Sequence, residues 1–167
     1  NKLILVTKPL AVPKDNLEVF EGVLAPGFVN AHCHLELSHL KLIRNAKGIG
    51  LFNFIKLIKR RYSVSKEEII AKIECAETQM IKNGIVGVGD ICNTTDSLSQ
   101  KIKRRLEYYN FVEVFGVEDK NADQIISDAK VLRKQFRDFG MQSTITPHAA
   151  YSVPKKLMKE ISKTFDY

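Results

Sequence analysis

The chain of 167 residues is poor in cysteine and has no long apolar run. Its three cysteines, Cys33, Cys75 and Cys92, are odd in number and lack C-x-x-C spacing, which argues against a disulfide framework and favours a reducing compartment. No apolar run approaches the roughly 20 residues of a membrane span, and the stretch 3–6 is too short for a signal-peptide core. These absences predict a cytoplasmic protein with no membrane partner.

The charged residues lean to one sign, with 26 Lys and Arg against 19 Asp and Glu. Most of the excess lies in Lys56–Arg61 and Lys101–Arg105. Both runs interleave apolar residues at helical spacing, and neither has the glycine–aromatic pattern of an RNA-binding sheet or a zinc-finger spacing. We therefore expect two solvated helix faces and no nucleic-acid partner. A basic, non-catalytic binding module and a surface that meets another part of the protein are the alternatives.

Residues 26–39 hold three of the four histidines. The apolar run here predicts a short buried strand over Phe28–His34. Side chains alternate along a strand, so His32 and His34 should share one face while Cys33 points to the other. Two imidazoles about 6–7 Å apart on one strand face can share a metal ion. Two core histidines bonded to backbone carbonyls are the structural alternative.

Strand and helix patterns alternate along the rest of the chain. The best-marked helix begins at Ser65, which forms a capping box with Glu68, and ends at Asn83-Gly84. Strands begin about 25–30 residues apart in this region, which implies a parallel sheet with right-handed crossovers. Further strands are expected at 85–90, 111–115 and 141–147, and further helices at 51–62, 98–109, 125–136 and, capped by Ser152, up to Phe165.

Residues 1–25 differ from this pattern. They predict two short strands, 2–7 and 17–24, around a polar turn at 13–16. Such strands need a sheet to join, so we expect a further segment upstream.

Polar residues fall at or near the carboxyl ends of the four strands, which share one edge of a parallel α/β sheet where ligands bind. This placement favours the metal interpretation of the histidine pair. Asp90 and Glu113 are expected to support the site or cap helices, His39 to lie on the surface, and Tyr151 to shape a loop. The residues at the strand ends are His32, His34, Glu36, Asp90, Glu113 and His148.

Four strand–helix units are too few for an eight-stranded barrel, which needs about 250 residues. The units alone are compatible with an open doubly wound sheet or with a piece of something longer.

Three motifs resemble the amidohydrolase superfamily, in the branch of cytosine, guanine and adenosine-type deaminases and chlorohydrolases. They are Pro26–Glu36, which is highly specific, Thr146–Pro154, which is moderately so, and the weaker Gly84–Asp90. The resemblance covers nearly the whole chain. It implies an α/β fold in which 26–167 form about the first four units of a (β/α)8 barrel and 1–25 end the N-terminal segment of a small β-sandwich.

The resemblance also implies site residues. His32 and His34 match the ligands of one divalent ion, zinc or iron. His148 matches a catalytic histidine that faces the substrate, with a role as third metal ligand as the alternative, and Glu36 matches a position for a substrate contact. The family's later ligands and its catalytic glutamate have no counterpart here, and no histidine follows His148. We therefore expect an N-terminal half that alone binds metal weakly or not at all and has no turnover.

For the complete enzyme, the resemblance implies a metal-dependent hydrolase acting on a small molecule. Its reaction would be the hydrolytic deamination, or dechlorination, of an amino-substituted N-heterocycle such as a purine or pyrimidine derivative. Hydrolysis of a cyclic amide or imidazolone on the same scaffold is the second hypothesis, and the basic binding module is the third. The possible protein partner is a second copy of the same chain, in a homo-oligomer.

Overall fold

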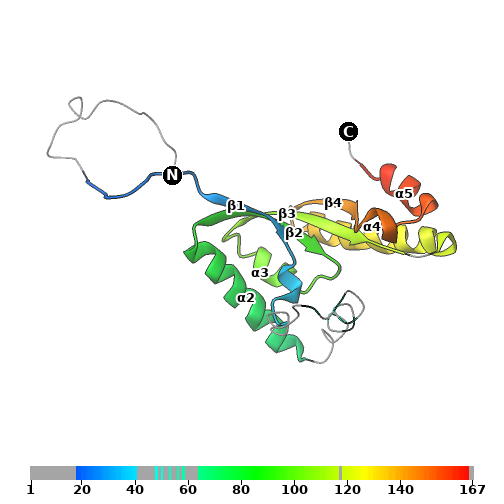
Figure 1. Cartoon of the computed structure of the whole chain (residues 1–167), viewed down its shortest axis with the longest axis horizontal. Coiled ribbons are helices and arrows are strands. Elements are labelled where there is room, and N and C mark those ends of the chain that lie inside the picture. The colour runs from blue at the N-terminus through cyan, green and yellow to red at the C-terminus, as the bar shows by residue number, and fades with distance from the viewer. Residues whose placement is uncertain are drawn as a thin grey trace.

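A four-stranded parallel sheet forms the centre of the molecule (Figure 1). The computed structural model describes residues 18–40, 64–116 and 118–165, with 48, 50, 53, 56 and 58 in addition. The strands pair in chain order, as the alternating pattern predicts. They are β1 (Phe28–Cys33), β2 (Ile85–Cys92), β3 (Glu107–Val114) and β4 (Gln142–Pro147).

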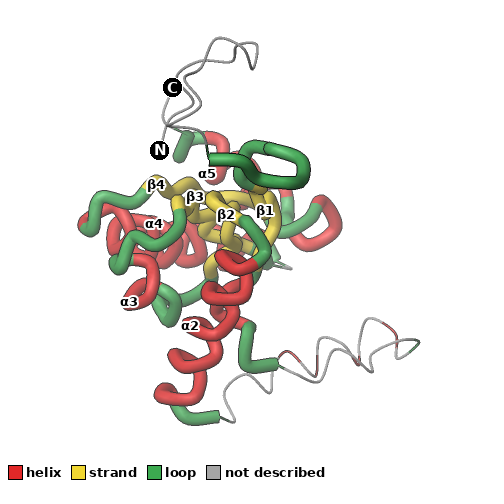
Figure 2. The backbone as a smooth tube through the Cα atoms, turned by 90° about the vertical axis from the view of Figure 1, so that its left-hand side faces the viewer, coloured by secondary structure: helices red, strands yellow, loops and turns green. Residues whose placement is uncertain are grey.

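Helices connect the strands and pack beside them (Figure 2). α2 lies between β1 and β2 in the chain, α3 between β2 and β3, and α4 between β3 and β4, while α5 follows β4. Short 3-10 turns follow three of the strands. The helices are α2 (Lys66–Lys82), α3 (Leu98–Lys101), α4 (Ala122–Asp138) and α5 (Lys155–Ser162), and the turns are η3 (Leu35–Leu37), η6 (Asp119–Asn121) and η7 (Ala150–Ser152).

Local signals set both ends of α2. Oγ of Ser65 accepts a hydrogen bond from the backbone N–H of Glu68 at 3.2 Å, which is the predicted N-cap. Asn83 is the C-cap, and Gly84 follows with φ +77°, a left-handed conformation that glycine adopts without strain. The predicted bounds of this helix are confirmed.

The helix predicted over 98–109 is wrong beyond α3. The chain turns at Arg104, which has φ +54°, and β3 begins at Glu107, so Tyr109 lies on a strand. The apolar spacing that suggested a helix instead spans a turn and a strand, because pairing with β2 recruits these residues into the sheet.

Two smaller expectations also fail. Ser152 does not cap the last helix: it lies in η7, its Oγ bonds the carbonyl of Ala149 at 3.1 Å, and Pro154 occupies the N-cap position of α5. Residues 18–24 form no strand and are exposed, since nothing in the described part of the chain pairs with them. The strand expected over 2–7 and most of the helix over 51–62 lie outside the described residues.

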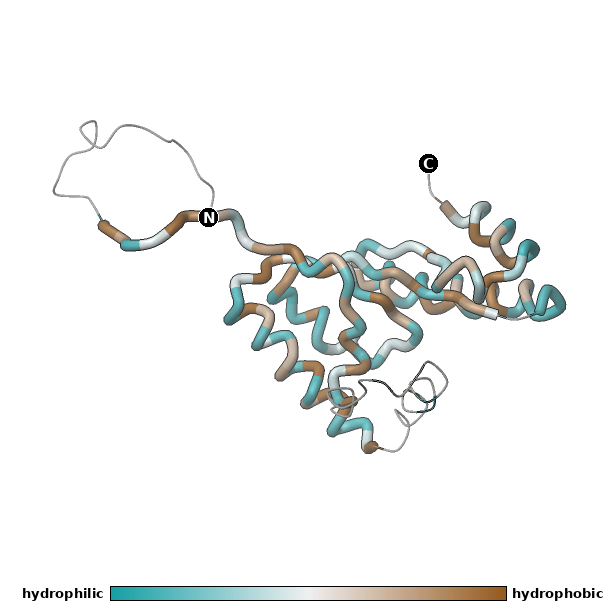
Figure 3. Tube along the Cα trace, in the orientation of Figure 1, coloured by the Kyte–Doolittle hydropathy of each residue, from teal (hydrophilic) through white to brown (hydrophobic). Residues whose placement is uncertain are grey.

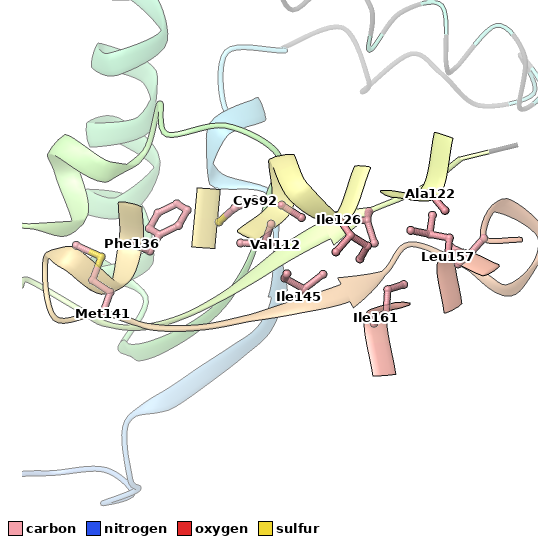
Figure 4. Packing of buried hydrophobic residues seen from close by; sticks show 12 residues of the cluster. Cys92, Val112, Ala122, Ile126, Phe136, Met141, Ile145, Leu157 and Ile161 are labelled. Atoms are coloured by element: carbon pink, nitrogen blue, oxygen red, sulfur yellow. The ribbon is translucent and has the colours of Figure 1, made fainter. Parts of the chain in front are cut away.

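The core lies between one face of the sheet and helices α4 and α5 (Figure 4). Val112 of β3 and Ile145 of β4 point into it, against Ile126 of α4 and Leu157 of α5. Apolar and polar residues alternate around the helices in Figure 3, as expected for helices with one buried face. Alternation along β3 leaves Glu113 on the opposite face of the sheet.

No helix among the described residues is long and apolar enough to cross a membrane. All three cysteines are free thiols; Cys75 is exposed and Cys92 is buried.

Candidate active site

The end of β1 brings two imidazole rings together. Nε2 of His32 lies 3.3 Å from Nε2 of His34, and the ring centroids are 5.2 Å apart. His32 is exposed and His34 is half-buried at the start of η3. The alternation of the strand thus has the predicted result, with both rings on one side and Cys33 on the other, near Asp90. The prediction that this strand is buried is wrong, since Phe28 and Val29 are 62% and 68% exposed.

The spacing of these nitrogens fits a shared metal ion. Two ligands on a tetrahedral zinc, each at about 2.0–2.1 Å, lie about 3.3–3.4 Å apart. The observed separation of 3.3 Å between the two Nε2 atoms matches this value. The same separation also fits one hydrogen bond between the Nε2 atoms of two neutral rings, and in either case these atoms face each other and not backbone carbonyls.

The electrostatic surroundings favour the neutral, ligating form of His34. Burial lowers the pKa of His34, and the nearby histidines His32 and His148 lower it further, while the carboxylates of Glu113 and Asp90 oppose the effect. Metal binding requires a neutral imidazole. The same interactions indicate that the carboxyl ends of β1, β3 and β4 are electrostatic neighbours.

His148 lies just beyond β4 and is held by β3. Its Nδ1 is 2.9 Å from Oε1 of Glu113, and its ring meets those of Phe115 and Tyr151 edge-on at centroid distances of 6.1 and 6.2 Å. Phe115 and Tyr151 are 56% and 80% exposed. Glu113 therefore holds the imidazole of His148 and does not cap a helix.

Among the described residues, no group of three His, Cys, Asp or Glu side chains could hold a metal ion. His148 is therefore not in position to join His32 and His34 as a third ligand in this structure.

Glu36 is buried, with 2% of its surface exposed. Its Oε2 accepts hydrogen bonds from the backbone N–H of Asn93 at 3.1 Å and from both the N–H and the hydroxyl of Thr94 at 2.8 Å. The residue expected to contact substrate thus binds the loop after β2.

Asp90 forms a buried ion pair that sequence reasoning missed. Its Oδ2 lies 2.5 Å from Nζ of Lys101, and both side chains are fully buried. Nζ also donates to Oδ1 of Asn110 at 2.7 Å and lies 4.9 Å from the centre of the Phe136 ring. Burial is the largest single effect and disfavours the lysine charge, but the charge of Asp90, the sulfur of Cys92 and the hydrogen bonds to both together raise the pKa of Lys101.

The solvated face predicted for Lys101–Arg105 is therefore wrong at Lys101. A lysine in a basic run gives no local signal of burial, because its partners Asp90 and Asn110 come from β2 and β3. The expectation for His39 is also wrong: it is 8% exposed rather than on the surface. No described residue hydrogen-bonds either of its ring nitrogens.

Residues 23–166 match the model of the amidohydrolase family, and the chain belongs to that family. It is 23% identical over 146 residues to a 5-methylthioadenosine/S-adenosylhomocysteine deaminase of Bacillus cereus strain G9842. The match covers 83% of this chain and 34% of the relative, so the chain spans about a third of that relative's length.

Two solved structures share the fold. One is an aminofutalosine deaminase of Helicobacter pylori in complex with methylthio-coformycin (TM-score 0.65, 22% identity, covering 83% of this chain and 34% of that one). The other is an E241Q mutant of an atrazine chlorohydrolase from Arthrobacter aurescens TC1 with zinc and atraton (TM-score 0.66, 10% identity, 83% and 38%). The four strands and their helices are thus part of a (β/α)8 barrel, not an open doubly wound sheet.

Proposed function

We propose that this chain supplies one part of the active site of a metal-dependent hydrolase that deaminates or dechlorinates an amino-substituted N-heterocycle. The observation that carries the proposal is the 3.3 Å approach of the two Nε2 atoms of His32 and His34. Membership of the amidohydrolase family and the zinc in the related chlorohydrolase structure support it. The ion is zinc or iron, and when bound it supplies Lewis-acid activation of water near neutral pH.

In this proposal His148 is the catalytic residue that contacts substrate. A carboxylate only accepts hydrogen bonds, so neutral His148 carries its proton on Nδ1, toward Glu113. Nε2 then keeps a lone pair that accepts a hydrogen bond from the amino group of a heterocycle. Phe115 and Tyr151, exposed beside the imidazole, offer faces on which a planar ring stacks.

Glu36 takes part through the loop it binds and not by direct contact, since Asn93 and Thr94 occupy its Oε2. Two protein ligands are fewer than the three of an ordinary catalytic zinc site, so this chain alone binds metal weakly. A cytoplasmic setting, a small-molecule partner and the division into a sandwich segment at 1–25 and a barrel part at 26–167 belong to the same proposal.

Metal binding tests the central claim. We expect the chain to bind Zn²⁺ in competition with a weak chromophoric chelator, and His32→Ala and His34→Ala each to remove most of that binding. His148→Ala is the matched control, expected to retain it. Equal Zn²⁺ binding by the wild type and both ligand variants would overturn the proposal, and an equal loss in His148→Ala would establish a three-histidine site.

The substrate class is tested by titrating the ¹⁵N-labelled chain with adenosine, guanine or a chlorotriazine, and separately with hydantoin. We expect the amino- and chloro-heterocycles to shift the resonances of His148, Phe115 and Tyr151. Shifts produced only by hydantoin would favour the cyclic-amide alternative.

A further inference from the structure

Two carboxylates tie the ends of β1 and β2 together in opposite directions. Asp90, on β2, accepts a hydrogen bond at 2.8 Å from the backbone N–H of Leu35, the residue after His34. Glu36, which follows Leu35, accepts hydrogen bonds from Thr94 and its neighbour in the loop after β2. Each strand end thus provides a carboxylate that binds the backbone of the other.

Burying either carboxylate costs free energy. We therefore infer that these contacts specify the backbone arrangement at the ends of β1 and β2 and contribute little to net stability. Asp90 is fully buried and Glu36 is 2% exposed. Lys101 neutralises Asp90 at 2.5 Å and is fixed in turn by Asn110 of β3. Buried ion pairs add little net stability compared with apolar residues of similar size, and their best-attested role is to specify one arrangement.

Both contacts follow His34 directly in the chain. Its carbonyl accepts a hydrogen bond from Leu37, its successor Leu35 is fixed by Asp90, and the next residue, Glu36, is fixed by the loop after β2. Backbone motion at this point would carry Nε2 of His34 away from the 3.3 Å approach to His32.

We propose that Asp90, with Lys101, and Glu36 are positioning residues that hold His34 in its metal-binding geometry. This inference rests on the proposed function, because it takes the pair of His32 and His34 as ligands. We call the set of contacts from Asp90 to Leu35 and from Glu36 to Asn93 and Thr94 the reciprocal clamp.

A matched pair of double variants separates positioning from bulk stability. Asp90→Asn/Lys101→Met and Asp90→Leu/Lys101→Met both remove the buried charges, but only the first keeps an oxygen for the N–H of Leu35. Glu36→Gln and Glu36→Ala form a second pair, in which only glutamine keeps an acceptor for the loop. The second pair also covers the case in which the leucine variant fails to fold.

The probe is Cu²⁺, which a given set of nitrogen ligands binds more tightly than Zn²⁺. Affinity is measured by titration, nitrogen coordination by electron paramagnetic resonance, and folding by thermal unfolding of each metal-free variant. We expect Asp90→Asn/Lys101→Met and Glu36→Gln to bind Cu²⁺ nearly as the wild type does. Their leucine and alanine counterparts should bind about tenfold or more weakly, in the range that supporting hydrogen bonds contribute to metal affinity.

Equal Cu²⁺ affinity within both pairs, in folded variants, would overturn the clamp alone. A double variant of His32→Ala and His34→Ala that binds Cu²⁺ as the wild type does would overturn both the clamp and the proposed metal site. The two failures are therefore distinguishable.

Discussion

Oε1 of Glu113 lies 2.9 Å from Nδ1 of His148, so β3 orients a histidine that β4 delivers to the edge of the sheet. The distance is that of an ordinary hydrogen bond. The carboxylate has only acceptors to offer, and it therefore selects the tautomer of the neutral ring.

The first prediction concerns that tautomer. Neutral His148 should carry its proton on Nδ1, and ¹⁵N chemical shifts of the ring nitrogens report it directly. Replacing Glu113 with alanine should release the preference, while the ring shifts of His39 should stay as they are. A wild-type ring with an unprotonated Nδ1 would be incompatible with the contact.

The second prediction concerns the stability of the fold in alkali. Burial, aided by the charge of Asp90, raises the pKa of Cys33 from 9.0 to about 12, and burial also raises the pKa of Cys92. Between these values the unfolded chain loses a proton that the native chain keeps, so the free energy of unfolding falls as the pH rises. The slope is at most about 1.4 kcal/mol per pH unit for each thiol.

Urea unfolding at pH 8, 9 and 10 measures this effect. The stabilisation of the native state by the protonated thiol of Cys33 is complete below about pH 9 and is lost as the pH rises toward 12. Burial followed by the charge of Glu77 raises the pKa of Tyr108, which adds to the loss at higher pH. Cys33→Ser should flatten the profile; a wild type and variant with the same slope would refute the assignment to Cys33.

The third prediction compares two glycines of β2. A Cβ on Gly89 would lie 2.7 Å from the carbonyl oxygen of Ala31, the residue before His32, whereas one on Gly87 would meet nothing closer than 3.7 Å. Gly89→Ala should therefore push β1 away from β2 and lower the free energy of unfolding by about 1–3 kcal/mol. Gly87→Ala should change it by less than about 1 kcal/mol. Similar values for both in chemical denaturation would contradict the close approach of the strands.

The fourth prediction addresses Lys101. Lys101→Met leaves the buried carboxylate of Asp90 without its cation and should cost about 3–5 kcal/mol in the free energy of unfolding. Adding Asp90→Asn should recover most of that loss, which a double-mutant cycle by urea unfolding detects as strong non-additivity. If Lys101→Met alone were as stable as the wild type, the carboxylate of Asp90 would not depend on this lysine. That result would contradict the buried ion pair.

Features with local causes could be predicted from the sequence. Ser65 with Glu68, and Asn83 before Gly84, specify the ends of α2 within a few residues of chain. The pairing of the two imidazoles likewise follows from the alternation of one strand.

Features with distant causes could not be predicted. Lys101 is buried because Asp90 and Asn110 arrive from neighbouring strands, and nothing in the basic run itself announces it. Glu36 accepts a hydrogen bond from Thr94, which is 58 positions away in the chain. The motif that contains Glu36 therefore indicates a site, but it does not predict which residues bind this carboxylate. The false helix at 98–109 has the same origin, since periodicity there competes with pairing between β2 and β3.

The order of the strands has a consequence for how the molecule assembles. Each strand pairs with its predecessor, but the intervals differ: Phe28 meets Ile85 across 57 positions, whereas Gly87 meets Glu107 across 20. Loop-closure entropy makes the first joining the more costly by about 1 kcal/mol. We therefore expect β2, β3 and β4 to form the folding nucleus. β1, which carries His32, should pair last during folding and separate first during unfolding.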